Sequence, residues 1–249
     1  MGNGRREITK WHSPILGQEM PIVSYGHWGH PLLLFPTAAA DFLENERFGL
    51  IGSVAAALDA GRVRVFSIDS INNQAWMDRG LPVQEQARRQ ALYSRYLEEE
   101  VVPFIRHTCQ SPDIRVATAG ASFGAFHAAN TLFRRPDLFD GVIAMSGFYD
   151  LGPDYLRGYG GDDAYFNNPA WYLPNLEGQS LHLLQTASQI HILTGQGAYE
   201  APHASRRLSE ILDRKGIPHL LDLWGYDVSH DWPWWRKMLP HYIGERVRW

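Results

Sequence analysis

Runs of β-branched and apolar residues alternate with helical stretches along most of this 249-residue chain, and this alternation constrains the fold more than any other feature. We expect strands at 63–69, 114–120, 141–147, 189–195 and 219–225. Stretches with helical spacing lie between them, at 83–108, 123–134 and 201–216. Strands that alternate with helices are typical of a parallel sheet covered on both faces. The sequence therefore predicts an α/β fold with a mostly parallel central sheet.

The first part of the chain predicts an antiparallel start to this sheet. Short apolar runs occupy 8–11, 21–26 and 31–36, and a Gly/His turn that suits a hairpin separates the last two. An Ala-rich helix is expected at 49–60, ending at Gly61. The 83–108 helix should kink at Pro103, because proline cannot donate a backbone hydrogen bond.

The length fits one α/β domain over residues 1–249. Segment 148–188 breaks the alternation, since it is rich in Gly, Asp, Tyr, Asn and Pro and is too long for an ordinary connection. We expect an irregular lid or pocket wall there. A last helix should begin near Asp231, a suitable N-cap, with Pro233 in its first turn.

Composition excludes several classes of protein. The net charge of −4 and the scattered arginine pairs give no reason to expect nucleic acid as a partner. Cys109 is the only cysteine, so an internal disulfide is excluded, and no Cys/His set suggests structural zinc. The first residues lack the apolar stretch of a signal peptide, and no run approaches the roughly 20 apolar residues of a membrane span. We expect a soluble cytoplasmic protein without a membrane partner.

A candidate nucleophile lies between a predicted strand and a predicted helix. Residues 120–124, GASFG, match G-x-S-x-G, with the strand at 114–120 before them and the helix from Phe123 after them. This context is that of a nucleophile elbow, in which a strained turn exposes the serine and small flanking residues let backbone pass closely. The sequence predicts Ser122 as nucleophile, with a histidine as its base.

The order of residues selects the base. In α/β-hydrolases the acid and then the histidine follow the serine along the chain. Among the later histidines, only His230 lies in a short loop between the last strand and the last helix, so we predict His230, with His241 as a distant rival. His127, on the helix after Ser122, is interpreted as a packing residue. Trp232, Trp234 and Trp235 are expected to anchor the last helix and to limit water around the loop.

The acid of the triad is less constrained than the base. Glu200 lies in the loop after the strand at 189–195, at the edge where active-site groups of open α/β sheets gather. Asp150, Asp222 and Asp227 remain alternatives. A solvated loop carboxylate is also compatible with the position of Glu200 before a helix.

An oxyanion hole needs two backbone N–H groups. The sequence predicts Phe123, which follows the nucleophile, and Thr37 or Ala38 in the loop after 31–36. Eight aromatic residues could line a substrate pocket, although core packing explains any one of them as well: Trp76, Tyr149, Tyr155, Tyr159, Tyr165, Phe166, Trp171 and Tyr172.

Residues 20–245 resemble the esterase D-type "putative esterase" family of α/β-hydrolases, which includes S-formylglutathione hydrolases, feruloyl and acetyl xylan esterases, enterochelin esterases and mycolyltransferases. The segments that carry the resemblance are PTAAADFLENERFGL, the elbow and its helix, TGQGAYE and SHDWPWWRKML. It implies an α/β-hydrolase fold and a Ser–Asp/Glu–His triad without metal or organic cofactor. On this chain the triad would be Ser122, Glu200 and His230.

The resemblance implies a serine carboxylic-ester hydrolase that acts through an acyl-enzyme on a small ester or thioester. The alternatives are an acyltransferase with the same triad and a non-catalytic binding protein on the hydrolase fold. The sequence defines neither the physiological ester nor the oligomeric state.

Overall fold

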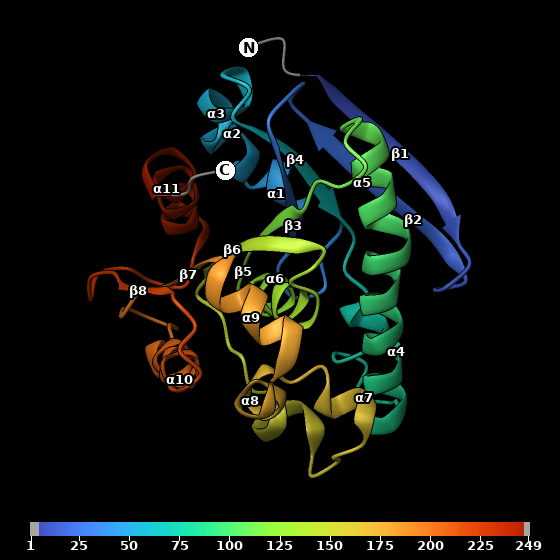
Figure 1. Ribbon diagram of the computed structural model, residues 1–249, viewed down its shortest axis with the longest axis vertical. Coiled ribbons are helices and arrows are strands. Elements are labelled where there is room, and N and C mark those ends of the chain that lie inside the picture. Colours follow the sequence, from blue (N-terminus) through green and yellow to red (C-terminus); the bar gives the residue numbers. More distant parts are fainter. Residues whose placement is uncertain (1–4, 247–249) are drawn as a thin grey trace.

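The computed structural model describes residues 5–246, and within them eight strands form one sheet (Figure 1). The strand order is β1-β2-β4-β3-β5-β6-β7-β8. Strands β3 to β8 are parallel to one another, whereas β1 pairs antiparallel with β2 and β2 pairs antiparallel with β4. The strands are β1 (Arg6–Ser13), β2 (Gln18–Tyr25), β3 (His30–Phe35), β4 (Val63–Ile68), β5 (Val116–Ala121), β6 (Phe139–Met145), β7 (Gln189–Thr194) and β8 (Leu220–Leu223). The predicted sheet, with its antiparallel start, is confirmed.

The predicted hairpin between 21–26 and 31–36 is wrong. β4 lies between β2 and β3, and the antiparallel hairpin is β1–β2. Residues 32–35 of β3 are fully buried, so both edges of this strand need a partner, and β4 and β5 supply them. The β2–β3 loop passes close to the start of β4, where a Cβ on Gly29 would lie 2.4 Å from the backbone of Arg62.

Helices cover both faces of the sheet, as predicted (Figure 1). Leu33 and Phe35 of β3 pack toward the face covered by α4, α5, α6, α9 and α10, and Leu32 and Leu34 pack toward α2, α3 and α11. The helices are α1 (Glu44–Arg47), α2 (Leu50–Ser53), α3 (Ala55–Asp59), α4 (Val83–Tyr96), α5 (Val102–Thr108), α6 (Phe123–Arg134), α7 (Asp162–Tyr165), α8 (Pro169–Tyr172), α9 (Gly178–Thr186), α10 (Pro202–Arg214) and α11 (Trp232–His241). Shorter turns are η1 (Asn72–Gln74), η2 (Leu97–Val101), η3 (Gly152–Leu156), η4 (Leu173–Asn175) and η5 (Tyr242–Arg246).

Two predicted helices are interrupted. The 49–60 stretch forms α2 and α3, which are separated at Val54, and it ends before Gly61 with a positive φ of 64°. The 83–108 stretch forms α4 and α5 with the π-helical turn η2 between them, directly before Pro103, which has no N–H to donate. None of the helices among residues 5–246 combines the length and the apolar character that crossing a bilayer requires.

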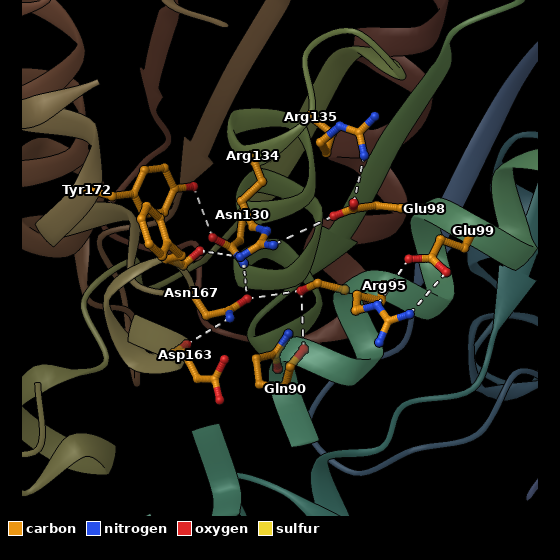
Figure 2. A network of polar contacts seen from close by, with 12 residues as sticks. Gln90, Arg95, Glu98, Glu99, Asn130, Arg134, Arg135, Asp163, Asn167 and Tyr172 are labelled. Atoms are coloured by element: carbon orange, nitrogen blue, oxygen red, sulfur yellow. Dashed lines mark hydrogen bonds and ion pairs between the residues drawn. The ribbon is translucent and has the colours of Figure 1, made fainter. Parts of the chain in front are cut away.

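Segment 148–188 is built of short helices, and the sequence did not predict α9. A buried amide network anchors the middle of the segment to α4 and α6 (Figure 2). The Asn167 side-chain oxygen accepts hydrogen bonds from Ser94 (3.0 Å) and Asn130 (3.2 Å), and the Tyr172 hydroxyl donates to Asn130 (3.0 Å). Arg134 of α6 also donates to the Phe166 carbonyl at 2.7 Å. The segment is therefore fixed to the helices beneath it at its middle.

Candidate active site

Ser122 lies in the strained turn between β5 and α6. Its φ of 57° and ψ of −122° are values that non-glycine residues rarely adopt. The two flanking glycines are sterically required. A Cβ on Gly120 would lie 2.4 Å from the Gly124 backbone, and a Cβ on Gly124 would lie 2.6 Å from the Pro36 carbonyl oxygen. The turn therefore has the geometry that G-x-S-x-G predicts.

Glu200 and His230 form a pair at the same edge of the sheet, where the carboxyl ends of the parallel strands lie. Glu200 follows β7 and His230 follows β8, next to each other in the sheet. His230 Nδ1 lies 3.6 Å from Glu200 Oε2, and the two side chains are 25% and 1% exposed. The His230 backbone N–H donates to the Ala198 carbonyl at 3.0 Å, so the two loops are tied together.

The Glu200 carboxylate is held by groups that the sequence did not identify. Ser146, directly after β6, donates to Oε1 at 2.6 Å, and Thr194 donates to Oε2 at 3.1 Å. The Trp235 indole N–H donates in turn to Ser146 Oγ at 2.9 Å. Ser146 has a positive φ of 54°, and no motif in the sequence indicates that it adopts this conformation.

The partners of Glu200 determine its protonation. Burial favours the neutral acid and raises the pKa, but the close contact with His230, the hydrogen bonds from Ser146 and Thr194 and the charge of His230 outweigh burial. The pKa of Glu200 is therefore lowered from its ordinary value of 4.5. A carboxylate that stays ionised can orient an imidazole and stabilise its charged form.

The alternative acids have other partners. Asp150 lies 3.4 Å from Arg207 and accepts from Asn168 at 3.0 Å. The Tyr242 hydroxyl donates to Asp222, and Asp227 is exposed. The rival base, His241, is the last residue of α11, where its ring contacts Trp224 and Tyr242. Among the candidate acids, only Glu200 has a recorded contact with His230 within residues 5–246.

The tryptophans after His230 have separate contacts. Asp231 caps α11 by accepting from the Trp232 N–H at 2.7 Å, as predicted. The Trp235 ring lies edge-on to the His230 ring, with centroids 5.0 Å apart. Trp232 stacks on Phe48 at 4.7 Å, and Lys237 Nζ lies 4.2 Å from the Trp234 ring centroid. Trp235 therefore supports both members of the pair, because it touches His230 and donates to Ser146.

The two predicted oxyanion loops meet at Ser122, but Thr37 is engaged elsewhere. Its backbone N–H donates to Glu44 Oε2 at 2.7 Å, and its hydroxyl donates to the same carboxylate. Within residues 5–246, the N–H groups of Ala38 and of Phe123, the first residue of α6, have no recorded hydrogen bond. Ala38 is therefore better placed than Thr37 to supply a free donor.

A buried histidine, His127, is linked to the Ala38 loop through Asn72. His127 Nε2 lies 3.0 Å from Asn72 Oδ1, and the Asn72 amide donates to the Ala38 carbonyl. Burial lowers the pKa of His127 to about 3, so its ring is neutral and its Nε2–H can donate to Asn72. The sequence predicts a packing role for His127, and the structure adds this hydrogen-bonded link to the oxyanion loop.

A cavity of about 450 Å³ borders the loops that carry Ser146 and Glu200, at Phe148 and Ala201, although Ser122, Glu200 and His230 do not line it. Phe148, Tyr149 and Tyr155 line one wall and His203 and Arg207 of α10 line another. Phe148 packs against the Phe123 ring at 4.9 Å, which places this wall next to the nucleophile turn.

Of the eight aromatic residues predicted for a pocket, only Tyr149 and Tyr155 line this cavity within the described residues. Trp76 is 1% exposed and donates to Gln90. Tyr165 lines a separate hollow with Phe166 and Tyr172, and Trp171 packs near Gly152.

Comparisons with known proteins agree with this geometry. A ferulic acid esterase superimposes with a TM-score of 0.75 at 16% identity over 97% of both chains. The S-formylglutathione hydrolase of Agrobacterium tumefaciens gives 0.71 at 14% identity over 96% of this chain and 92% of its own. MPT51 of Mycobacterium tuberculosis gives 0.70 at 16% identity over 97% of both chains. These similarities show the α/β-hydrolase fold.

The search of curated proteins found no sequence match. A family model does match, over residues 50–245, which include Ser122, Glu200 and His230. The chain therefore belongs to the esterase family described as "Putative esterase".

Proposed function

We propose that this esterase hydrolyses a small carboxylic ester or thioester with Ser122 as nucleophile, His230 as base and Glu200 as acid. The observation that carries the proposal is the pair of buried Glu200 and partly exposed His230, 3.6 Å apart, at the end of the parallel strands where the strained Ser122 also lies. The three residues follow β5, β7 and β8 in the order that α/β-hydrolases use.

In the first step, Ser122 Oγ attacks the carbonyl carbon and its proton passes to His230 Nε2. The carbonyl electron pair moves to oxygen and then returns as the bond to the leaving alcohol or thiol breaks, and that group takes the proton from His230. Water attacks the resulting acyl-enzyme and gives a proton to His230. When the acid departs, Ser122 Oγ recovers the proton. Glu200 stabilises the imidazolium formed in each half-reaction.

The N–H groups of Phe123 and Ala38 would hold the negative oxygen in both half-reactions. Each donor of this kind is typically worth about 2.7–4 kcal/mol of transition-state stabilisation. Phe123 begins α6, so the partial positive charge at the helix start adds to its effect.

The substrate class follows from the cavity beside the turn. Its aromatic wall suits the apolar part of an ester, and its volume of about 450 Å³ suits a small molecule. The named relatives act on ferulic acid esters and S-formylglutathione, so both oxygen esters and thioesters belong in a substrate screen.

Covalent labelling with a fluorophosphonate and turnover of p-nitrophenyl acetate test the proposal. We expect wild type to label and Ser122→Ala to lose labelling and about 10³-fold or more of kcat/KM. Ser188→Ala, a serine that bonds only to the Leu183 carbonyl, is the matched control and should behave as wild type. An unlabelled wild type, or turnover unchanged in Ser122→Ala, would falsify the catalytic assignment. Product analysis with added alcohols separates hydrolysis from acyl transfer.

A further inference from the structure

A second cavity lies at the opposite end of the parallel strands from Ser122. It measures about 420 Å³. Its walls come from the start of β4 at Arg64, the β2–β3 loop with His27 and Trp28, and the residues after α5 around Cys109. The α5 helix ends toward the same end of the molecule as the start of β1 (Figure 1). Because β4 runs parallel to β3, and β3 to β5, the length of the strands separates this cavity from the candidate active site.

Arg64 is a buried cation without a carboxylate partner in the described chain. The residue is 8% exposed, and Nη1 donates to the Thr108 carbonyl at 2.8 Å. Its Nε is buried with no hydrogen-bond partner, and Arg64 forms no ion pair with the side chains described in residues 5–244. The guanidinium also lies against the Cys109 thiol and over the Phe66 ring, with Cζ 5.5 Å from the ring centroid. None of these partners is an anion, so the buried guanidinium retains part of its desolvation cost, which an anion in the cavity would offset.

The surroundings of Arg64 supply no internal counter-anion. None of the side chains that line the cavity, all within the described residues, is a carboxylate, whereas Arg5 and His27 add donors. The Cys109 thiol lies beside the guanidinium, but burial raises its pKa despite the arginine, so the thiol stays neutral. The wall is therefore positive on a chain whose net charge is −4.

Trp28 gives this cavity a flat apolar face. It is 70% exposed although its neighbours on β2 and β3 are buried. The Trp28 side chain lies over Gly61, where an added Cβ would come within 3.6 Å of it, and the His27 ring lies at 3.7 Å from the same point. An exposed indole beside a desolvated cation can stack on a planar ring whose charged substituent reaches the arginine.

We propose that this cavity is a binding site for a small planar anion, an aromatic ring that carries a carboxylate or a phosphate. The ring stacks on Trp28 and the anionic group pairs with Arg64, with Arg5 at the rim. The cavity volume is within the range of small-molecule sites. Binding here requires neither Ser122 nor the Glu200–His230 pair, so the proposal is independent of the esterase mechanism.

Isothermal titration calorimetry of the full chain tests this site with two probes, indole-3-acetate for the aromatic carboxylates and adenosine 5′-monophosphate for the nucleotides. We expect at least one to bind with a Kd below about 1 mM, and its neutral counterpart, indole-3-acetamide or adenosine, to bind about tenfold more weakly. Which probe binds identifies the source of the anion. The proposal fails if neither anion binds at about 5 mM, or if the neutral compounds bind equally well.

Variants assign the binding to this cavity. Arg64→Met should weaken the bound probe by about tenfold or more, and Trp28→Ala should weaken it by about fivefold. Trp28→Ala changes an exposed side chain and keeps the test valid if Arg64→Met does not fold. Arg62→Met is the matched control, since Arg62 precedes β4 and bonds to the Gly244 carbonyl outside the cavity. Binding that persists in both Trp28→Ala and Arg64→Met would overturn the assignment.

Discussion

Glu200 and Arg64 are both buried charges, and they lie at opposite ends of the parallel strands. Glu200 has a partner for each oxygen, with Ser146 on one and Thr194 and His230 on the other. Arg64 has a backbone carbonyl and the Phe66 ring as partners, and no carboxylate contacts it among the side chains described in residues 5–244. A buried charge with a full set of partners is stabilised by the protein itself. A buried charge with few partners is stabilised further when a bound ligand supplies the opposite charge.

The largest expected effect is at Glu200. Glu200→Gln should lower kcat/KM for p-nitrophenyl acetate by about 10³–10⁴-fold, because the imidazole loses its orienting charge. Asp150→Asn and Asp227→Asn are the controls and should remain folded and active, since neither carboxylate contacts His230. The opposite result, with activity lost in Asp150→Asn and kept in Glu200→Gln, would move the acid to Asp150.

The second effect concerns buried Asn72, which donates a hydrogen bond to the loop that carries Ala38. Asn72→Leu should lower kcat by about 10- to 100-fold with little change in KM, because the Ala38 carbonyl loses the Asn72 amide and keeps the Ser70 hydroxyl, at 3.2 Å, as its donor. Asn73→Leu is a close control, since Asn73 is exposed and bonds to the next carbonyl, that of Ala39. Equal kcat values for the two variants would remove Asn72 and His127 from the mechanism.

The third prediction is a pH dependence of stability. The folded protein keeps His127 neutral down to a pKa of about 3, whereas the unfolded chain binds a proton near the ordinary value of 6.5. The contribution of His127 is therefore complete above 6.5 and is lost as the pH falls toward 3, at up to about 1.4 kcal/mol per pH unit.

Urea unfolding of wild type and His127→Gln between pH 7 and pH 4.5 measures this contribution, since the range begins above the ordinary pKa of 6.5 and ends where the contribution is being lost. The free energies of unfolding of the two proteins should approach each other as the pH falls. Parallel curves would mean that His127 is not the group that resists protonation.

The smallest expected effect is at Arg64. Without ligand, Arg64→Met should change the melting temperature by no more than about 2 °C, because the lost hydrogen bond is offset by the removed desolvation cost. Glu200→Leu should lower it by several times as much, about 5 °C or more, because Ser146 and Thr194 lose their acceptor. Scanning calorimetry of both variants measures the contrast. A large loss in Arg64→Met would make Arg64 a structural ion.

Local patterns predicted much of the fold and of the candidate site. Strand runs, the helix after Ser122 and the Asp231 cap are local properties, and the structure has them. The G-x-S-x-G turn could be predicted because its two glycines pack directly against backbone atoms, a requirement that appears in the sequence as a motif of five residues. The resemblance to the esterase family is confirmed by the family model.

The misses involve pairings between distant segments. The turn at Gly26–Gly29 resembles a hairpin turn, and only the burial of β3 on both edges explains why β4 intervenes. α9 was missed because its first residue, Gly178, is a helix breaker. The sequence left the choice between Thr37 and Ala38 as oxyanion donor open, because the hydrogen bond from the Thr37 N–H to Glu44, on the next helix, is not visible in the sequence.

The sequence by itself determined the order of strands and helices, the elbow at Ser122 and the histidine loop, because each depends on residues that are neighbours along the chain. Tertiary structure alone decided which carboxylate faces His230, which N–H of the oxyanion loop is free, and that Ser146 and Trp235 support Glu200. The physical reason is that charges and hydrogen bonds are satisfied by proximity in space. Arg64 follows the same rule, since its lack of a carboxylate partner is visible only when the chain is folded around it.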